Sequence, residues 1–115
     1  MRIEFLYWED CPSHEEALAR LRQVLVAEGL PDAVEVIRID AQQDADRLAF
    51  PGSPTIRIDG VDLQPEGAGP ASLSCRIYRT EIGRLSPLPT PTMIRRALQA
   101  RRHTTEEAHD ATDHS

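Results

Sequence analysis

Apolar residues along the chain recur at spacings typical of strands in some segments and of helices in others. Residues 3–7 form a short, mostly apolar run, which predicts a buried strand in the centre of a sheet. Residues 12–28 carry apolar side chains three or four positions apart, which predicts an amphipathic helix that ends at Gly29. Residues 33–39 predict a second strand, and residues 42–48 predict a short helix. This order of elements indicates an α/β domain.

Proline and glycine divide the middle of the chain. Pro51-Gly52-Ser53-Pro54 interrupts it after the second predicted helix. Two short strands, over residues 55–58 and 61–63, then flank Asp59-Gly60, a dipeptide that favours two-residue hairpin turns. Residues 64–72 are rich in proline and glycine and predict an irregular loop. We therefore expect an antiparallel hairpin followed by a loop.

The C-terminal third contains one more predicted helix. Residues 73–78 alternate between apolar and polar, which allows a short strand but does not require one. A stiff connector follows, with prolines at positions 87, 89 and 91, and Thr90 or Thr92 can cap the helix after it. Its inward face is formed by Ile94, Ala97 and Leu98. Residues 103–115 are small, polar and acidic and predict a disordered tail, so the folded domain is expected over residues 1–102.

Length and composition limit the classes of function. A chain of 115 residues, with 40% hydrophobic and 28% charged residues, supports one domain with its own core. No apolar run is long enough to span a membrane, and no secretory leader precedes the first strand, so we expect a cytoplasmic protein without a membrane role. The net charge is −6 and no basic patch is present, which argues against nucleic acid as a partner.

Cys11 lies between the first predicted strand and the first predicted helix. As the N-cap of that helix, with Pro12 in the first helical position, it would meet unpaired backbone amides and a partial positive charge that favour a thiolate. His14 can pair with this thiolate when protonated, whereas Glu9 and Asp10 repel it. We therefore predict that Cys11 is a nucleophile with a lowered pKa. The alternative is a half-buried cap cysteine without chemistry.

A cysteine before the first helix, followed by Ser53-Pro54-Thr55 before a hairpin, resembles the thioredoxin-like fold, and the resemblance covers residues 1–102. It implies a central mixed sheet of about four strands flanked by about three helices. It also implies that the bond before Pro54 is cis, although an ordinary turn proline is the alternative. Ser53, Pro54 and Trp8 are then the expected substrate-binding residues, while Trp8 can alternatively serve packing alone.

The usual C-x-x-C motif of that family is replaced here by Cys11-Pro12-Ser13-His14, so the local resolving cysteine is absent. A mixed disulfide on Cys11 must be resolved by glutathione, by another protein or by Cys75. The resemblance thus implies a redox or thiol-transfer protein that acts on a small thiol or a protein thiol and needs no cofactor. Cys75 is its possible second thiol, or else a buried structural cysteine. Arg76 and Arg79 can bind a partner's carboxylate, or they are only exposed charges.

The separation of Cys11 and Cys75 is similar to that of two cysteines in the thioredoxin-like catalytic part of alkylmercury lyases. This second resemblance implies that the two thiolates bind mercury while an acid protonates the leaving carbanion. His14 occupies the position of that family's acid residue, and the family's separate N-terminal domain is missing. Cleavage of an organomercurial, or soft-metal binding without turnover, is therefore the alternative function. A redox-inert interaction scaffold is a further hypothesis.

Overall fold

The computed structural model describes the backbone of residues 1–113 and the side chains of residues 1–102. Its main sheet is mixed and has four strands in the order β2-β1-β3-β4. These strands are β1 (Ile3–Tyr7), β2 (Val34–Arg38), β3 (Thr55–Ile58) and β4 (Val61–Asp62). β2 runs parallel to β1, whereas β3 is antiparallel to β1 and β4 is antiparallel to β3. The predicted α/β class and the central position of the first strand are confirmed.

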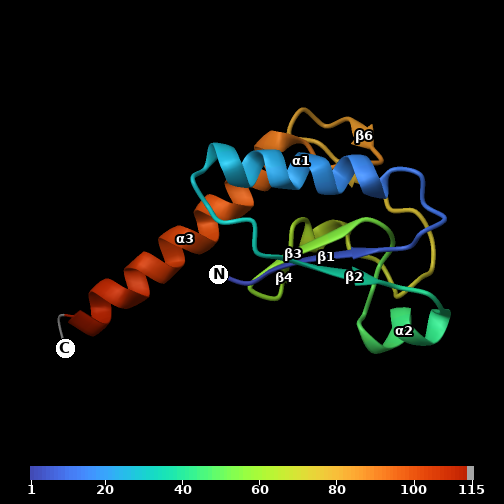
Figure 1. Ribbon diagram of the computed structural model, residues 1–115, viewed down its shortest axis with the longest axis horizontal. Helices are drawn as coiled ribbons and strands as arrows, with labels where there is room; N and C mark the ends of the chain where they lie inside the picture. The colour runs from blue at the N-terminus through green and yellow to red at the C-terminus, as the bar shows by residue number, and fades with distance from the viewer. Residues whose placement is uncertain (114–115) are drawn as a thin grey trace.

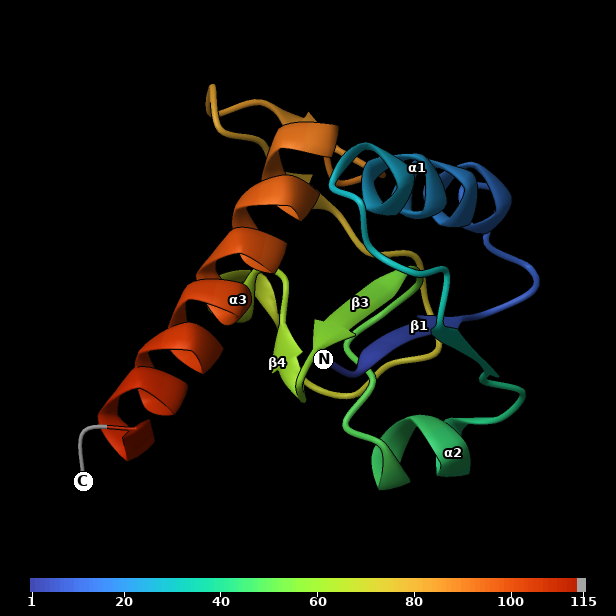
Figure 2. The ribbon, with the colours of Figure 1, turned by 60° about the vertical axis from the view of Figure 1, so that its left-hand side comes forward.

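Helices cover both faces of this sheet (Figure 1). They are α1 (His14–Ala27), α2 (Gln42–Arg47) and α3 (Pro91–Asp113). The core on the side of α1 and α3 is formed by Ile3, Phe5, Ala17, Leu21, Val24, Leu25, Ile56, Ile58, Leu88, Ile94 and Leu98. The smaller core on the side of α2 is formed by Leu6, Ile39, Ala45 and Phe50. β1 supplies both, because successive side chains of a strand point to opposite faces; Figure 2 shows α1 and α2 on the two sides of the sheet.

Two smaller elements lie between β4 and α3: a 3₁₀ turn, η1 (Pro65–Gly67), and a two-stranded sheet of β5 (Tyr78–Arg79) and β6 (Leu85–Ser86). The predicted turns are present. Asp59 and Gly60 have φ angles of +53° and +80°, which is the backbone of a type I′ hairpin turn. Thr90 caps α3, since its Oγ1 accepts a hydrogen bond from the Met93 N–H at 3.1 Å. The Ser53–Pro54 bond is cis, as the resemblance implies.

The start of α1 differs from the prediction. Ser13 is the N-cap, so the predictions that Cys11 caps the helix and that Pro12 is its first residue are wrong. The Cys11 N–H donates instead to the Trp8 carbonyl at 3.0 Å, and the first helical hydrogen bond joins the Ala17 N–H to the Ser13 carbonyl at 3.1 Å. A separate turn over residues 8–11 therefore precedes the helix and holds Cys11 outside it.

The end of α3 also differs from the expectation. The helix runs on to Asp113 and so includes residues 103–113, where the composition predicts disorder. Residues 114 and 115 of the predicted tail lie outside the described residues. Within the part of the chain that is described, no helix is both long and apolar enough to cross a bilayer.

The segment before β5 pairs with the loop before β3. The Ser53 N–H donates to the Ser74 carbonyl and the Arg76 N–H donates to the Ser53 carbonyl, each at 2.8 Å. These bonds form an isolated parallel bridge between Ser53 and Cys75. Gly52 permits the close approach, because its φ is +135° and a Cβ there would lie 3.1 Å from the Arg76 Cβ. The sequence allowed a strand over residues 73–78. In the structure, only the bridge at Cys75 and β5 are formed in this segment.

Alternation along this segment buries Arg76 and Tyr78 and exposes Cys75 and Ile77. The Arg76 guanidinium makes a two-ended ion pair with Asp62, both N–O distances being 2.7 Å, and lies 4.5 Å from the centroid of the Tyr78 ring. Both roles considered for Arg76 are therefore wrong, since its guanidinium is neither free for a partner's carboxylate nor exposed. It anchors the segment that carries Cys75.

We expect Asp62→Ala to lower the free energy of unfolding by about 3 kcal/mol, because the buried guanidinium of Arg76 would lose its counter-charge. Urea denaturation followed by circular dichroism measures the change. The control is Asp32→Ala, which removes an ion pair with Arg22 whose side chains are 53% and 47% exposed. This control should cost less than about 1 kcal/mol. Equal losses in the two variants would contradict the anchoring role of Arg76.

Candidate thiol site

The Cys11 side chain is fully buried, at 0% exposure, in the turn between β1 and α1. Its Sγ lies 3.2 Å from the Ser13 Oγ and, as a thiol, donates to the Ser53 carbonyl at 3.4 Å. The Ser53 Oγ in turn accepts a hydrogen bond from the Trp8 N–H at 3.0 Å. Two serines, Ser13 at the start of α1 and Ser53 in the loop before β3, therefore form the polar surroundings of this sulfur.

Cys75 is exposed and is brought to Cys11 by the backbone bridge with Ser53. Hydrogen bonding from the Cys75 thiol helps to lower the pKa of Cys11, although it contributes less than Ser13 does. Burial, this hydrogen bond and the charge on Cys11 together raise the pKa of Cys75. The interpretation of Cys75 as a buried structural cysteine is wrong. Two cysteines that are distant in the sequence meet across Ser53.

The pKa of Cys11 is set by opposing effects. Burial raises it, but hydrogen bonds to the thiolate from the Ser13 side chain, the Ser13 backbone, the Ser53 side chain and Cys75 outweigh burial, so the net pKa is lowered. This direction is the one we expect from the sequence. The backbone amide of Ser13 acts as expected, but hydroxyl and thiol donors take the place of the expected imidazolium.

His14 does not make the expected pairing with Cys11. Its ring stacks on Tyr7, with centroids 4.7 Å apart and an interplanar angle of 27°. Within residues 1–102, no hydrogen bond or ion pair joins His14 to Cys11. Glu9 is held by Arg38 at 2.7 Å, which offsets its repulsion of the thiolate. A catalytic role for His14 stays a prediction.

Trp8 and Pro54 are each held in place by contacts with buried residues. The Trp8 side chain packs on the smaller core, and its backbone holds Cys11 and Ser53 as described above. The Pro54 carbonyl accepts a hydrogen bond from the buried hydroxyl of Tyr78. These contacts explain how the site is held in place, and the substrate-binding roles of Trp8, Ser53 and Pro54 stay predictions.

Sequence reasoning missed two contributions. The Ser13 hydroxyl is the strongest of the groups that lower the pKa of Cys11, and its position two residues after Cys11 in a turn was the available signal. The pairing of Arg76 with Asp62 had no local signal, because it depends on tertiary contact. Among the described residues, no three His, Cys, Asp or Glu side chains are grouped to hold a metal ion. The two cysteine thiols are the candidate thiolate ligands for a soft metal.

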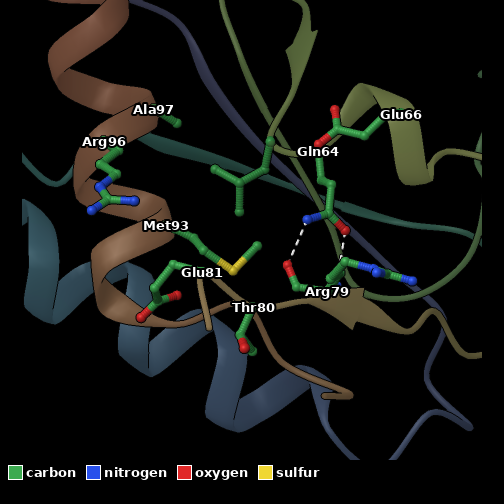
Figure 3. A pocket seen from close by; sticks show the side chains of 9 residues that line it. Gln64, Glu66, Arg79, Thr80, Glu81, Met93, Arg96 and Ala97 are labelled. Atoms are coloured by element: carbon green, nitrogen blue, oxygen red, sulfur yellow. Dashed lines mark hydrogen bonds between the residues drawn. The ribbon is translucent and has the colours of Figure 1, made fainter. Parts of the chain in front are cut away.

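A shallow hollow of about 440 Å³ lies on another part of the surface, between η1, β5 and α3 (Figure 3). The amide of Gln64 crosses its wall and makes hydrogen bonds of 2.7 and 3.0 Å with the backbone of Arg79. Neither cysteine lines this hollow. The chemistry of the thiol pair therefore takes place elsewhere.

Comparisons of this chain with protein-family models, with curated proteins and with solved structures found no match. The function must accordingly be inferred from the thiol site. Its defining features are a buried sulfur with a lowered pKa, an exposed sulfur beside it, and a serine backbone between them.

We expect Ser13→Ala to raise the pKa of Cys11, because the substitution removes the strongest hydrogen bond to the thiolate. The titration is followed by thiolate ultraviolet absorbance in a Cys75→Ser background, where Cys11 is the only thiol. Ser86→Ala is the control, since that hydroxyl accepts the Leu88 N–H. It should leave the pKa unchanged. An unchanged pKa in Ser13→Ala would contradict the assigned cause.

Proposed function

We propose that this chain is a thiol–disulfide redox protein in which Cys11 and Cys75 form one redox pair. The observation that carries the proposal is the position of Ser53, whose backbone pairs with Cys75 and whose carbonyl accepts a hydrogen bond from the Cys11 thiol. A second sulfur close to an activated one can resolve a mixed disulfide without a local C-x-x-C motif. Cys75 then takes the part of the cysteine that is missing after Cys11.

The reaction balances with a partner disulfide as the oxidant. The two thiols lose two electrons and two protons and form the Cys11–Cys75 disulfide, while the partner disulfide becomes two thiols. The hydrogen bonds from Ser13 and Ser53 stabilise the reduced form, because they act on the thiolate of Cys11. A pair whose reduced form is stabilised is an oxidising one, so we expect the protein to accept electrons readily.

A thioredoxin-like fold agrees with this function and is part of the proposal. It is supported by the mixed sheet, by the helices on both of its faces, and by the cis bond before Pro54 next to the buried Cys11. The partner is a small thiol or a protein thiol. A reducing compartment such as the cytoplasm would hold the pair as thiols between turnovers.

Soft-metal binding is the second candidate. Mercury prefers sulfur ligands, and the observation that favours this candidate is that Ser53 contacts both cysteines, Cys75 through its backbone and Cys11 through its carbonyl. Cleavage of a carbon–mercury bond needs an acid at the leaving carbon, and His14 is engaged with Tyr7. The geometry thus favours binding over cleavage.

Oxidation of the wild-type protein with glutathione disulfide should produce an internal disulfide that protects both cysteines from alkylation together. Mass spectrometry after alkylation with a maleimide measures this directly. The controls are Cys11→Ser and Cys75→Ser, each of which should stop at a mixed disulfide with glutathione, because the resolving sulfur is gone. Separate glutathione adducts on the two cysteines of the wild type, without the internal disulfide, would refute the proposed redox pair.

For the second candidate, titration with mercuric ion should give one ion bound per chain under excess small thiol. Either serine substitution, at Cys11 or at Cys75, should weaken binding by at least about tenfold, because each removes one thiolate ligand. Undiminished binding in Cys11→Ser would exclude this site. Incubation with an alkylmercury compound and excess thiol distinguishes cleavage from binding alone, since the hydrocarbon is released only when the carbon–mercury bond is cleaved.

A further inference from the structure

The two sulfurs of the pair differ sharply in access. Cys11 is fully buried beneath the turn that joins β1 to α1, with its sulfur in contact with Ser13 and Ser53. Cys75 is exposed, and it shares the outer side of its extended segment with Ile77, which is 53% exposed. A partner sulfur must approach along the line of the disulfide bond that it breaks. Only the side of Cys75 offers such an approach from solvent.

We propose that a partner thiol attacks the oxidised pair at Cys75 and that Cys11 is the sulfur that leaves. The inference rests on the proposed redox function and deepens it by assigning the two sulfurs different roles. It reverses the roles predicted from the sequence, in which Cys11 is the nucleophile and Cys75 resolves. In the reducing direction, Cys75 is the sulfur that attacks an external disulfide, and Cys11 resolves the product.

The contacts of Cys11 suit a leaving sulfur. When a partner thiolate bonds to the Cys75 Sγ, the bond between the two cysteines breaks and its electron pair stays on Cys11 as a thiolate. Ser13 and Ser53 are already placed to donate hydrogen bonds to this charge. Thiol exchange is faster when the leaving thiol has the lower pKa, so attack at Cys75 is favoured by chemistry as well as by access.

A second partner thiolate completes the reaction. It attacks the partner sulfur of the mixed disulfide and displaces Cys75, which takes up a proton. The two partner thiolates have then become a disulfide, and the protein has gained two electrons and, with Cys11 as a thiolate, one proton. In the opposite direction, the Cys75 thiol releases its proton to solvent, to which it is exposed, and attacks the external disulfide as a thiolate.

The test follows the first step on the oxidised full-length chain. It is treated briefly with glutathione, quenched with acid and N-ethylmaleimide, and digested for peptide mapping. We expect glutathione on Cys75 together with maleimide on Cys11. This labelling should be at least about tenfold more abundant than glutathione on Cys11 with maleimide on Cys75. A parallel reaction with a reduced, unfolded protein as the thiol source gives the same pattern if the inference holds. If glutathione reacts faster, the partner is a small thiol. If the thiol of the unfolded protein reacts faster, the partner is a protein.

Single-cysteine variants provide an independent measurement. Cys11→Ser should form a mixed disulfide with glutathione disulfide at least about tenfold faster than Cys75→Ser, provided that thermal unfolding finds both variants folded. Faster reaction of Cys75→Ser, or glutathione found on Cys11 of the wild type, would overturn the assignment while leaving the redox pair intact. Failure of the wild type to form the internal disulfide would overturn both the pair and the assignment.

Discussion

The thiol site depends on the backbone of one residue, Ser53. Its N–H and carbonyl pair with the segment that carries Cys75, while its carbonyl accepts the Cys11 thiol and its hydroxyl accepts the Trp8 N–H. A buried backbone group without a partner is costly, so these bonds hold the three segments in one arrangement. The order of strands alone would not bring the sulfurs together. The bridge at Ser53 does so.

Charge is kept away from the reactive sulfur by pairing. Arg76 is bound to Asp62 and Glu9 is bound to Arg38, so these charges near the two cysteines are each balanced by an opposite charge. The Cys11 thiolate is then stabilised by neutral donors within a buried environment. Hydrogen bonds to a charged acceptor are stronger than those between neutral groups, which explains how they outweigh the cost of burial.

Local patterns predicted most of the fold and part of the site. The apolar run of β1, the helical spacing in α1 and the Asp59-Gly60 turn each determine structure over a few residues, and each was confirmed. The predicted start of α1 was wrong, because the Cys11 N–H donates a hydrogen bond to the Trp8 carbonyl and a turn replaces the first predicted helical residues. Burial of Arg76 was not predictable, since its ion pair with Asp62 joins segments that only the tertiary fold brings together. Cys75 was expected beside Cys11 only from the resemblances, because the backbone bridge to Ser53 that carries it there leaves no local signal in the sequence.

The most direct test of the account is equilibration of the wild type and Ser13→Ala with glutathione redox buffers, followed by alkylation and mass spectrometry. We expect one two-electron transition in which both cysteines change state together, at a potential more negative in Ser13→Ala, because that variant loses a bond to the Cys11 thiolate. Independent formation of glutathione adducts on Cys11 and Cys75, with no shared transition, would contradict the account.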